Sequence, residues 1–316
     1  MVDKRPARGV SLSEPLANLD DFTAVLTQHV ESSTLTANEK GTLGHQTQAP
    51  SQRRALTRLS GEGDSEIVLR ELLSRGGQGA VYLAEQTSLQ RLVAVKVATG
   101  KDGSTDERRA ASLLVEARVS GRLEHPNIVP VHIVGTGDDG QPLLVMKRVE
   151  GQTWRKLINA GRDLERDVRI LLDVCKALAL AHSHGIAHCD VKPGNVMVGV
   201  AGDVYLVDWG VAVGFGDNAP ADIPVAKDIK TVFGTPKYLA PEMALPQGSI
   251  DQRTDIYVCG AVLHELVTGT ALHQGTVTEA LLHAAHTRIG RTEPLFKGRP
   301  RSTPCETALL FRLTVR

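Results

Sequence analysis

Short apolar runs separated by turn residues follow one another between Glu66 and Val149. Five of these runs have the length and aliphatic content of strands: 67–69, 81–83, 92–95, 128–134 and 143–149. The first three flank a glycine-rich turn and predict a meander, and the last two, joined by Gly137-Asp138-Asp139-Gly140, predict a hairpin. Between the two groups, residues 106–123 space their apolar side chains as an amphipathic helix does. This region therefore predicts five antiparallel strands and one helix.

Beyond Gly151 the apolar positions take up helical spacing. They recur every three or four residues from Val168 to Ala179, and residues 255–267 are almost wholly apolar, as expected of a helix buried at the centre of a lobe. A further amphipathic helix is predicted over 277–289. Two other features separate these helices: a pair of short strands, 196–200 and 204–207, and a stretch rich in glycine and proline, 210–241. The second region is therefore helix-rich.

The first 65 residues lack the apolar content of a packed domain. Their only aromatic residue is Phe22, Ser and Thr are frequent, and apolar residues gather only between Leu16 and Val30. Low hydrophobicity cannot offset the entropy lost on ordering a chain. We therefore predict a disordered tether over 1–65, with a short helix at 20–30 as its ordered element.

Composition excludes several classes of protein. At ~150 residues per domain, 316 residues amount to about two domains of chain, too many for a peptide or a disulfide-rich miniprotein. The 36 basic and 36 acidic residues balance, so neither nucleic acid nor a lipid surface is expected as a partner. No run approaches the ~18 apolar residues of a membrane span. The four cysteines are far apart, which favours a reducing, cytoplasmic location.

A glycine cluster and a lysine in the first region form the first candidate site. Gly76-Gly77-Gln78-Gly79 lies between two strand signals, and by itself such a cluster is more often a plain turn than a phosphate-binding loop. Lys96, however, ends the apolar run 92–95, and a buried ammonium needs a carboxylate or phosphate partner. Glu116, twenty residues later on the predicted helix, is placed to supply that partner.

The segment from His188 to Asn195 and the triplet Asp208-Trp209-Gly210 carry the second candidate site. Transfer of the terminal phosphoryl group of a nucleotide needs a carboxylate to orient the attacking hydroxyl, and an amide oxygen and a second carboxylate for Mg²⁺. It also needs a cation on the transferred phosphate. Asp190, Asn195, Asp208 and Lys192 are these four groups in that order. A loop of polar capping residues explains any one of them but not the ordered set.

From about Glu66 to Gly269 the chain resembles the bacterial eukaryotic-like serine/threonine protein kinases, which belong to the protein kinase superfamily. The resemblance rests on motif residues in the family's order: Gly76, Gly79, Val81, Lys96, Glu116, 125–129, Asp190, Asn195, Asp208, Ala240-Pro241-Glu242 and 255–260. It implies an α+β fold with two lobes, a small lobe of five antiparallel strands over 66–149 and a larger helical lobe over 150–316. Lys192 and Thr235 indicate Ser or Thr as acceptor.

The same resemblance implies ATP and Mg²⁺ as cofactors and assigns residues to them. The implied catalytic residues are Asp190, Lys192 and Asn195, and the implied metal ligands are Asn195 and Asp208. The residues implied to bind ATP are Gly76, Gly77, Gly79, Val81, Ala94, Lys96, Glu116, Met146, Lys147 and Val149. Adenine is expected against the linker 147–149, where main-chain groups tolerate an unusual side chain.

Three positions depart from the family pattern. Ser74 stands where the first loop glycine is usual, which we expect to weaken nucleotide binding at most. Trp209 replaces a phenylalanine. Cys189 stands where most members have an arginine that pairs with a phosphate on the segment before Glu242, and we expect its thiol to be inert. A phosphate at Thr231 would lack that partner.

Three histidines near the second candidate site and the residues after 289 give two further expectations. We expect His188 to be packed in its loop, and His182 and His184 to be surface groups at a helix end rather than zinc ligands. After residue 289 the lobe lacks about two helices of average length, roughly 20 to 30 residues, including an arginine that would pair with Glu242. We therefore expect the helical lobe to be truncated at its carboxyl end.

The favoured interpretation is an ATP- and Mg²⁺-dependent kinase that phosphorylates Ser and Thr residues of proteins, with self-phosphorylation as an open possibility. The main alternative is a catalytically weak pseudokinase that acts as a nucleotide-sensing binding module, favoured by Ser74 and the short carboxyl end. A small-molecule kinase is disfavoured by the segment from Gly234 to Glu242, which in the family shapes a peptide-binding ledge.

Overall fold

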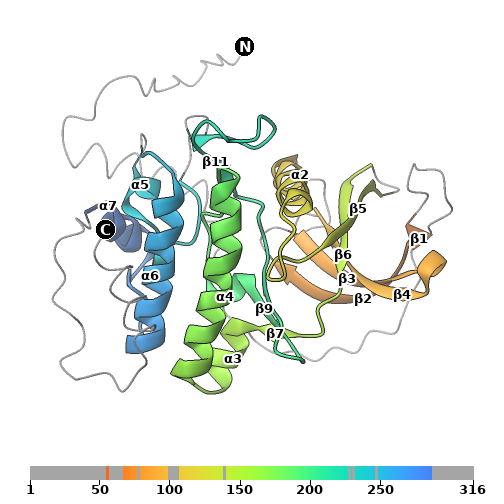
Figure 1. Ribbon diagram of the computed structural model, residues 1–316, viewed down its shortest axis with the longest axis horizontal. Helices are drawn as coiled ribbons and strands as arrows, with labels where there is room; N and C mark the ends of the chain where they lie inside the picture. Colours follow the sequence, from red (N-terminus) through yellow and green to blue (C-terminus); the bar gives the residue numbers. More distant parts are fainter. Residues whose placement is uncertain are drawn as a thin grey trace, which may run out of the picture. The chain divides into compact units, whose positions relative to one another are not determined.

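The computed structural model describes most of the chain between Ile67 and His286, and also residues 55 and 56 (Figure 1). The described ranges are 55–56, 67–76, 79–98, 107–137, 140–226, 229, 232–245 and 248–286. The predicted helix at 20–30, nearly all of the predicted tether, Gly77, Thr231 and the expected truncation after residue 289 lie outside these ranges.

An antiparallel sheet forms the first region, with strand order β1-β2-β3-β4-β6-β5. Its strands are β1 (Ala55–Leu56), β2 (Ile67–Gly76), β3 (Gly79–Gln86), β4 (Arg91–Val97), β5 (Val131–Thr136) and β6 (Pro142–Lys147). The five predicted strands are confirmed. The sixth, β1, was not predicted, because two residues show no periodicity, and it comes from the segment assigned to the tether.

The two faces of the sheet differ in what they contact. Alternating side chains of β4 place Val93 and Val95 in one apolar core cluster, together with Ile67, Ala84, Leu143 and Val145. Ala94, Lys96 and Ala98 point to the opposite face, where Ala98 packs against α2 (Glu107–Arg122). The helix predicted over 106–123 is therefore confirmed, and its inner face carries the buried Glu116 among apolar side chains. One face of the sheet is aliphatic core, and the other faces the candidate site.

Helices dominate the second region, as predicted. They are α3 (Trp154–Ala160), α4 (Leu164–Ser183), α5 (Pro241–Ala244), α6 (Gln252–Thr268) and α7 (Val277–His286). The Asp163 carboxylate caps the start of α4, Asp251 caps α6, and Gly269 ends α6 in a left-handed conformation. Helices α4 and α6 pack side by side along the lobe (Figure 1). The predicted 255–267 helix therefore lies within α6, and its buried side includes Val258, Cys259, Val262 and Leu266.

Short strands connect these helices and position the loops of the site. They are β7 (Gly151–Thr153), β8 (Ile186–Ala187), β9 (Val196–Gly199), β10 (Val204–Leu206) and β11 (Val213–Gly214). β9 and β10 are the predicted strand pair, and β8 pairs with β11. The loop between β8 and β9 contains Asp190, and the turn after β10 contains Asp208. No helix in the described ranges is long and apolar enough to cross a membrane.

Candidate active site

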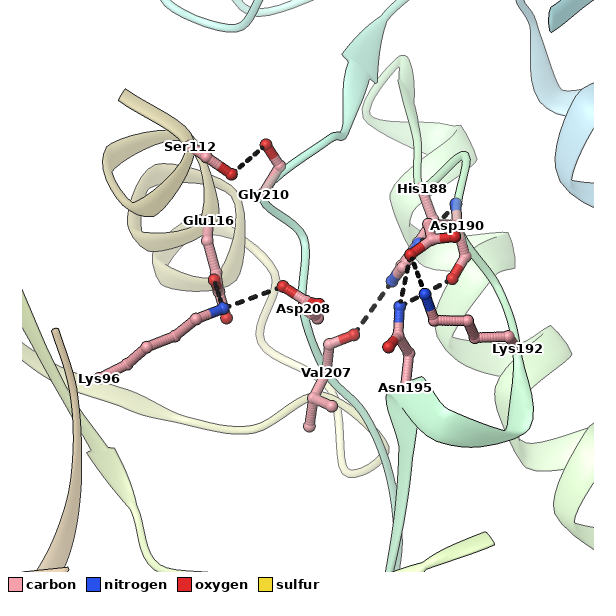
Figure 2. Close-up of polar contacts among 10 residues, drawn as sticks. All are labelled: Lys96, Ser112, Glu116, His188, Asp190, Lys192, Asn195, Val207, Asp208 and Gly210. Carbon is pink, nitrogen blue, oxygen red and sulfur yellow. Dashed lines mark hydrogen bonds and ion pairs between the residues drawn. The ribbon is translucent and has the colours of Figure 1, made fainter. Parts of the chain in front are cut away.

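Lys96 lies at the centre of a buried cluster of three charges. Its Nζ donates to Glu116 Oε2 at 2.5 Å and to Asp208 Oδ1 at 2.9 Å, and both contacts are drawn in Figure 2. Burial would lower the pKa of Lys96, but the two carboxylates raise it above its ordinary value. Burial also raises the pKa of Glu116 to about 6, against the opposing effect of Lys96. The lysine is therefore a fixed cation at this site.

The turn from Asp208 to Gly210 is tied to helix α2. Asp208 has a positive φ of 71°, which is uncommon for a residue other than glycine. Ser112 Oγ of α2 donates to the Gly210 carbonyl at 2.8 Å. Trp209 is 1% exposed, its ring lies 4.5 Å from that of His188, and its Nε1 is the one buried side-chain polar atom in the described ranges that makes no hydrogen bond. Helix α2 thus holds both Glu116 and the Asp208 turn.

Asp190 is the centre of a second cluster, built by the loop that follows β8. Lys192 Nζ donates to Asp190 Oδ2 at 2.8 Å, and Asn195 Nδ2 donates to the same oxygen at 3.0 Å and to the Asp190 carbonyl at 2.9 Å. Thr235 Oγ1 donates to Asp190 Oδ1 at 2.6 Å and accepts from Lys192 Nζ at 2.7 Å. In Figure 2, Lys96 and Glu116 lie on one side of Asp208, and Asp190, Lys192 and Asn195 lie on the other.

The buried carboxylate of Asp255, at the start of α6, anchors the loop before Asp190. It accepts the backbone N–H groups of His188 and Cys189, each at 2.8 Å, and the Nε2 of His182 at 2.8 Å. Cys189 adopts a positive φ of 65° there. The prediction that His182 is a surface group is wrong, because its side chain is 11% exposed and points to Asp255. His184 is exposed and His188 is buried, as predicted.

The predicted ATP-binding residues of the sheet share one face. In the strand register Val81 lies opposite Lys96, and Ala94 lies opposite Met146. Because residues opposite one another in a sheet point to the same side, these four side chains line the face that carries Lys96. At Gly79, φ is 134° and an added Cβ would lie 2.2 Å from the Val97 carbonyl oxygen, so only glycine fits. Gly76 pairs with Gly79 at the end of the hairpin.

The linker after β6 makes its own contacts. The Lys147 amide donates to the Pro130 carbonyl at 2.9 Å, and Lys147 Nζ donates to the Tyr205 hydroxyl and lies 4.7 Å from the centre of its ring. A pocket of about 440 Å³ opens beside the linker, lined by Leu92, 147–150, 199–200, Asp203 and Tyr205. Its lining includes Lys147 and Val149 but none of Lys96, Asp190 and Asp208, so it is not the place where the two clusters meet.

The three histidines near Asp190 and the thiol of Cys189 carry the nitrogen and sulfur atoms that metal or thiol chemistry would use. No group of three or more His, Cys, Asp and Glu side chains in the described part of the chain could hold a metal ion. Burial raises the pKa of Cys189 well above its ordinary value, and the nearby carboxylates of Asp255, Asp190 and Glu242 raise it further. The thiol is therefore neutral, in line with the prediction that it is inert.

Sequence reasoning missed one polar cluster near the site. Arg155 of α3 binds Glu265 of α6 through two nitrogens, and both contact the hydroxyl of Tyr238, three residues after Thr235. The available signal was Glu265 itself, a carboxylate in an almost wholly apolar helix, because a buried charge needs a partner. Thr235 was named only as a sign of the acceptor type, and its bond to Asp190 was not predicted.

The arrangement brings together three carboxylates, an amide and two lysines. Because Asn195 uses its Nδ2 for both bonds to Asp190, its Oδ1 is the atom that can bind a cation. Carboxylate and amide oxygens are hard ligands of the kind that Mg²⁺ prefers. Lys96 and Lys192 supply positive charge on two sides of the same space, which suits a polyanion such as a nucleotide phosphate chain. The residues therefore fit both ATP and Mg²⁺.

Comparisons with known proteins all find similarity to protein kinases. A family model described as protein kinase domain matches residues 67–305. A Streptomyces coelicolor protein described as a probable serine/threonine-protein kinase is 38% identical over 63% of this chain. The serine/threonine-protein kinase PknH of Mycobacterium tuberculosis is 39% identical over 64% of this chain, and PknB of Mycolicibacterium smegmatis is 36% identical over 64%. The matched parts span 30%, 31% and 32% of these relatives, so the chain aligns with about a third of their length.

Proposed function

The chain belongs to the protein kinase domain family, and we propose that it is a serine/threonine protein kinase that transfers the γ-phosphoryl group of ATP to protein hydroxyls. One observation carries the proposal: two carboxylates from different loops, Asp190 and Asp208, are each paired with a lysine. A loop that only capped helices would not need two such pairs. Phosphoryl transfer needs both, because substrate and nucleotide bind at different carboxylates.

The Lys96 cluster is the proposed nucleotide side of the site. ATP would supply the transferable group, and Mg²⁺ would offset the charge that develops on it. Lys96, oriented by Glu116, would bind the phosphates next to the nucleoside, and Asp208 and Asn195 would bind Mg²⁺. The 2.5 Å contact between Lys96 and Glu116 supports this assignment, since it fixes the ammonium group before any ligand arrives.

The Asp190 cluster is the proposed acceptor side. Asp190 would accept a hydrogen bond from the acceptor hydroxyl, orient it and take its proton, while Lys192 would neutralise the transferred group. The Thr235 hydroxyl supports this role, because it already donates to Asp190 Oδ1 at 2.6 Å and so shows that an aliphatic hydroxyl fits there. Serine and threonine side chains carry the same group.

The adenosine part of ATP is proposed to lie on the shared sheet face. Gly76, Gly77 and Gly79 would cover the phosphates with backbone N–H groups. Four apolar or linker residues would contact the base: Val81, Ala94, Met146 and Val149. Lys147 would contribute its main chain there, since its side chain is committed to Tyr205.

No observation on the described residues favours the alternative of a catalytically weak binding module, because every group that transfer requires is present there. Proteins with Ser or Thr acceptors, including the chain itself, are the proposed substrates. We also place the activity in the cytoplasm, where ATP is available and the free thiols of Cys175, Cys189 and Cys259 would stay reduced.

Intact-mass measurement after incubation with ATP and Mg²⁺, with and without a generic basic protein acceptor, tests the proposal. We expect phosphate on the chain or on the acceptor. Asp190→Asn should abolish both products, while Asp217→Asn, the same change at an exposed carboxylate, should leave them unchanged. Absence of transfer by the unaltered chain, or equal transfer by Asp190→Asn, would contradict the proposal.

A further inference from the structure

Two thiols meet where helices α4 and α6 pack side by side (Figure 1). Cys175 lies in α4 and is half-buried, and Cys259 lies in α6 and is fully buried. Their side chains are hydrogen-bonded to each other, with the Cys259 thiol donating to the Cys175 sulfur. The proposed phosphoryl transfer uses neither residue, so this thiol pair is a separate feature of the helical lobe.

The two thiols of the pair differ in reactivity. The hydrogen bond from Cys259 favours a thiolate at Cys175 and lowers the pKa of Cys175, against the opposing effect of burial. The same bond raises the pKa of Cys259 well above its ordinary value, and burial and the nearby Asp255 carboxylate raise it further. Because the thiolate is the form that attacks an oxidant, Cys175 is the nucleophile of the pair and Cys259 stays a thiol beside it.

Cys189 provides a comparison within the same lobe. Its side chain is 1% exposed, and its pKa is raised by burial and by three carboxylates. Burial and a small thiolate fraction both protect a cysteine from oxidation. Cys175 has the opposite properties, because it is partly exposed, its thiolate is favoured, and a second thiol lies against it to react with its first oxidation product.

We propose that Cys175 and Cys259 form a redox-modification site, in which a hydroperoxide oxidises Cys175 and Cys259 then closes a reversible disulfide between α4 and α6. First, the Cys175 thiolate attacks the O–O bond and becomes a sulfenic acid, while the departing alkoxide or hydroxide takes a proton from water. Next, the Cys259 sulfur attacks the Cys175 sulfur, the S–O bond breaks, and hydroxide leaves with the thiol proton as water. Two electrons pass from the two sulfurs to the peroxide, and exchange with a small dithiol reverses the reaction.

The disulfide would have a structural consequence for the helical lobe. The sulfur atoms are already in contact, and a disulfide brings them to about 2 Å. The bond would close a loop of chain that contains Asp190 and Asp208, and it would join α4 to the helix whose Asp255 anchors the loop before Asp190. Because closing so long a loop lowers the entropy of the unfolded chain, the oxidised protein should unfold at a higher temperature than the reduced one.

Peptide mapping of the full chain after treatment with hydrogen peroxide tests the proposal. The folded protein is oxidised at neutral pH, its remaining thiols are blocked with a maleimide, and the unreduced tryptic digest is analysed by mass spectrometry. Trypsin cleaves after Arg169, Lys176 and Arg253, so the expected product is peptide 170–176 joined to the peptide that follows Arg253. Dithiothreitol should separate the two peptides.

Matched substitutions separate the roles of the two thiols. In Cys259→Ala, Cys175 should stop at the sulfenic acid, which dimedone traps, whereas in Cys175→Ala no sulfenic acid should form at Cys259. Cys189→Ala, the same change at the protected thiol, should give the disulfide as the unaltered chain does. Without oxidant, a maleimide should label Cys175 about tenfold faster than Cys189.

Thermal unfolding gives a second readout. Oxidation should raise the midpoint by about 5 °C or more, and dithiothreitol should restore the original value. An unchanged or lower midpoint would contradict a disulfide that fits the native helices. Oxidation that leaves Cys175 and Cys259 unlinked, a disulfide to another cysteine instead, or dimedone labelling of Cys259 in Cys175→Ala would overturn the proposal. None of these measurements uses phosphoryl transfer, so their outcome is independent of the proposed kinase function.

Discussion

The Lys96 cluster and the Asp190 cluster both pair a lysine with a carboxylate, but they are assembled in different ways. Lys96, Glu116 and Asp208 come from a strand, a helix and a turn, and they are joined by two contacts of the same ammonium group. The Asp190 cluster arises within one loop, whose backbone is bound to the buried Asp255 and whose open side is closed by Thr235.

The difference lies in what must move to break each cluster. A displacement of α2 would remove Glu116 from Lys96 and would also release the Ser112 contact with Gly210. No comparable single displacement opens the Asp190 loop, because α6, the loop and the Thr235 turn all hold it. We infer that the acceptor side is formed before substrate arrives and that the nucleotide side depends on where α2 lies.

Lys96→Met should have the largest effect of the substitutions that separate the two clusters. The change removes both contacts of the ammonium group and leaves Asp208 and Glu116 as adjacent carboxylates without a cation between them. We expect kcat/KM to fall by about 10²- to 10³-fold, with weaker ATP binding measured by calorimetry. Asp190→Asn should abolish transfer but keep ATP affinity. Equal ATP affinity in Lys96→Met and the unaltered chain would contradict the nucleotide role.

Asp255→Asn tests the anchor of the acceptor side. An amide can present only one oxygen, so the N–H of His188 or Cys189 would face an NH₂ group, and a buried donor left unsatisfied costs about 1–3 kcal/mol. We expect a loss of unfolding free energy of this size in urea titrations, and a lower kcat with unchanged ATP affinity. Asp203→Asn, at an exposed position, is the control. A fall in ATP affinity as large as the fall in kcat would show that the two clusters are not independent.

Glu116→Gln tests the pH dependence of the nucleotide side. Since the pKa of Glu116 is raised from 4.5 to about 6, the carboxylate forms as pH rises through 6, and activity that needs its pairing with Lys96 should rise over the same range. Stability should respond oppositely: the contribution of this group is full below pH 4.5 and is lost as pH rises through 6.

Glutamine at this position cannot titrate, so subtracting the Glu116→Gln profiles isolates the effect of Glu116 from that of histidines that titrate nearby. Activity profiles measured at fixed saturating Mg²⁺ and urea titrations at each pH provide the data. If the unaltered chain and the Glu116→Gln variant have the same pH profile, Glu116 does not govern the nucleotide side.

Asp222→Asn should have the smallest effect. Asp222 bonds Arg122 at the end of α2, and a second arginine, Arg118, lies beside it, but all three side chains are exposed. The Arg122 hydrogen bond lowers the pKa of Asp222. Exposed pairs contribute little and are screened by salt, so we expect activity to change by about twofold or less, and only at low ionic strength. A larger loss that persists in high salt would mean that this pair fixes α2 after all.

Most residues of the candidate site could be predicted from the sequence because they lie in short motifs with a fixed order. Asp190, Lys192 and Asn195 are within six residues of one another, and Asp208 follows a strand pair that was itself predicted. The sheet face that carries Lys96 was not assigned from the sequence and comes from the strand register. The roles of these residues stay predictions, whereas the five strands, α2 and the buried α6 are confirmed.

Contacts between distant elements could not be predicted in the same way. Arg155 lies 83 residues from Tyr238 and 110 from Glu265, so their meeting depends on how α3 packs against α6. His182 was assigned to the surface because it lies near a helix end, yet that end packs against Asp255. The strand β1 is too short to show alternation. In each case the missing information was the packing of whole elements, which local patterns do not contain.

The fluorescence of Trp209 can report on the nucleotide side of the site. The chain has two tryptophans, and the other, Trp154, donates its N–H to Asp167 at 2.9 Å, whereas the Trp209 N–H has no partner and its ring lies against that of His188. An indole without a hydrogen bond emits at shorter wavelength than a hydrogen-bonded one. In a Trp154→Phe chain, the tryptophan emission would therefore come from Trp209 alone, which is next to Asp208. Its wavelength would report on the conformation of the Asp208 turn.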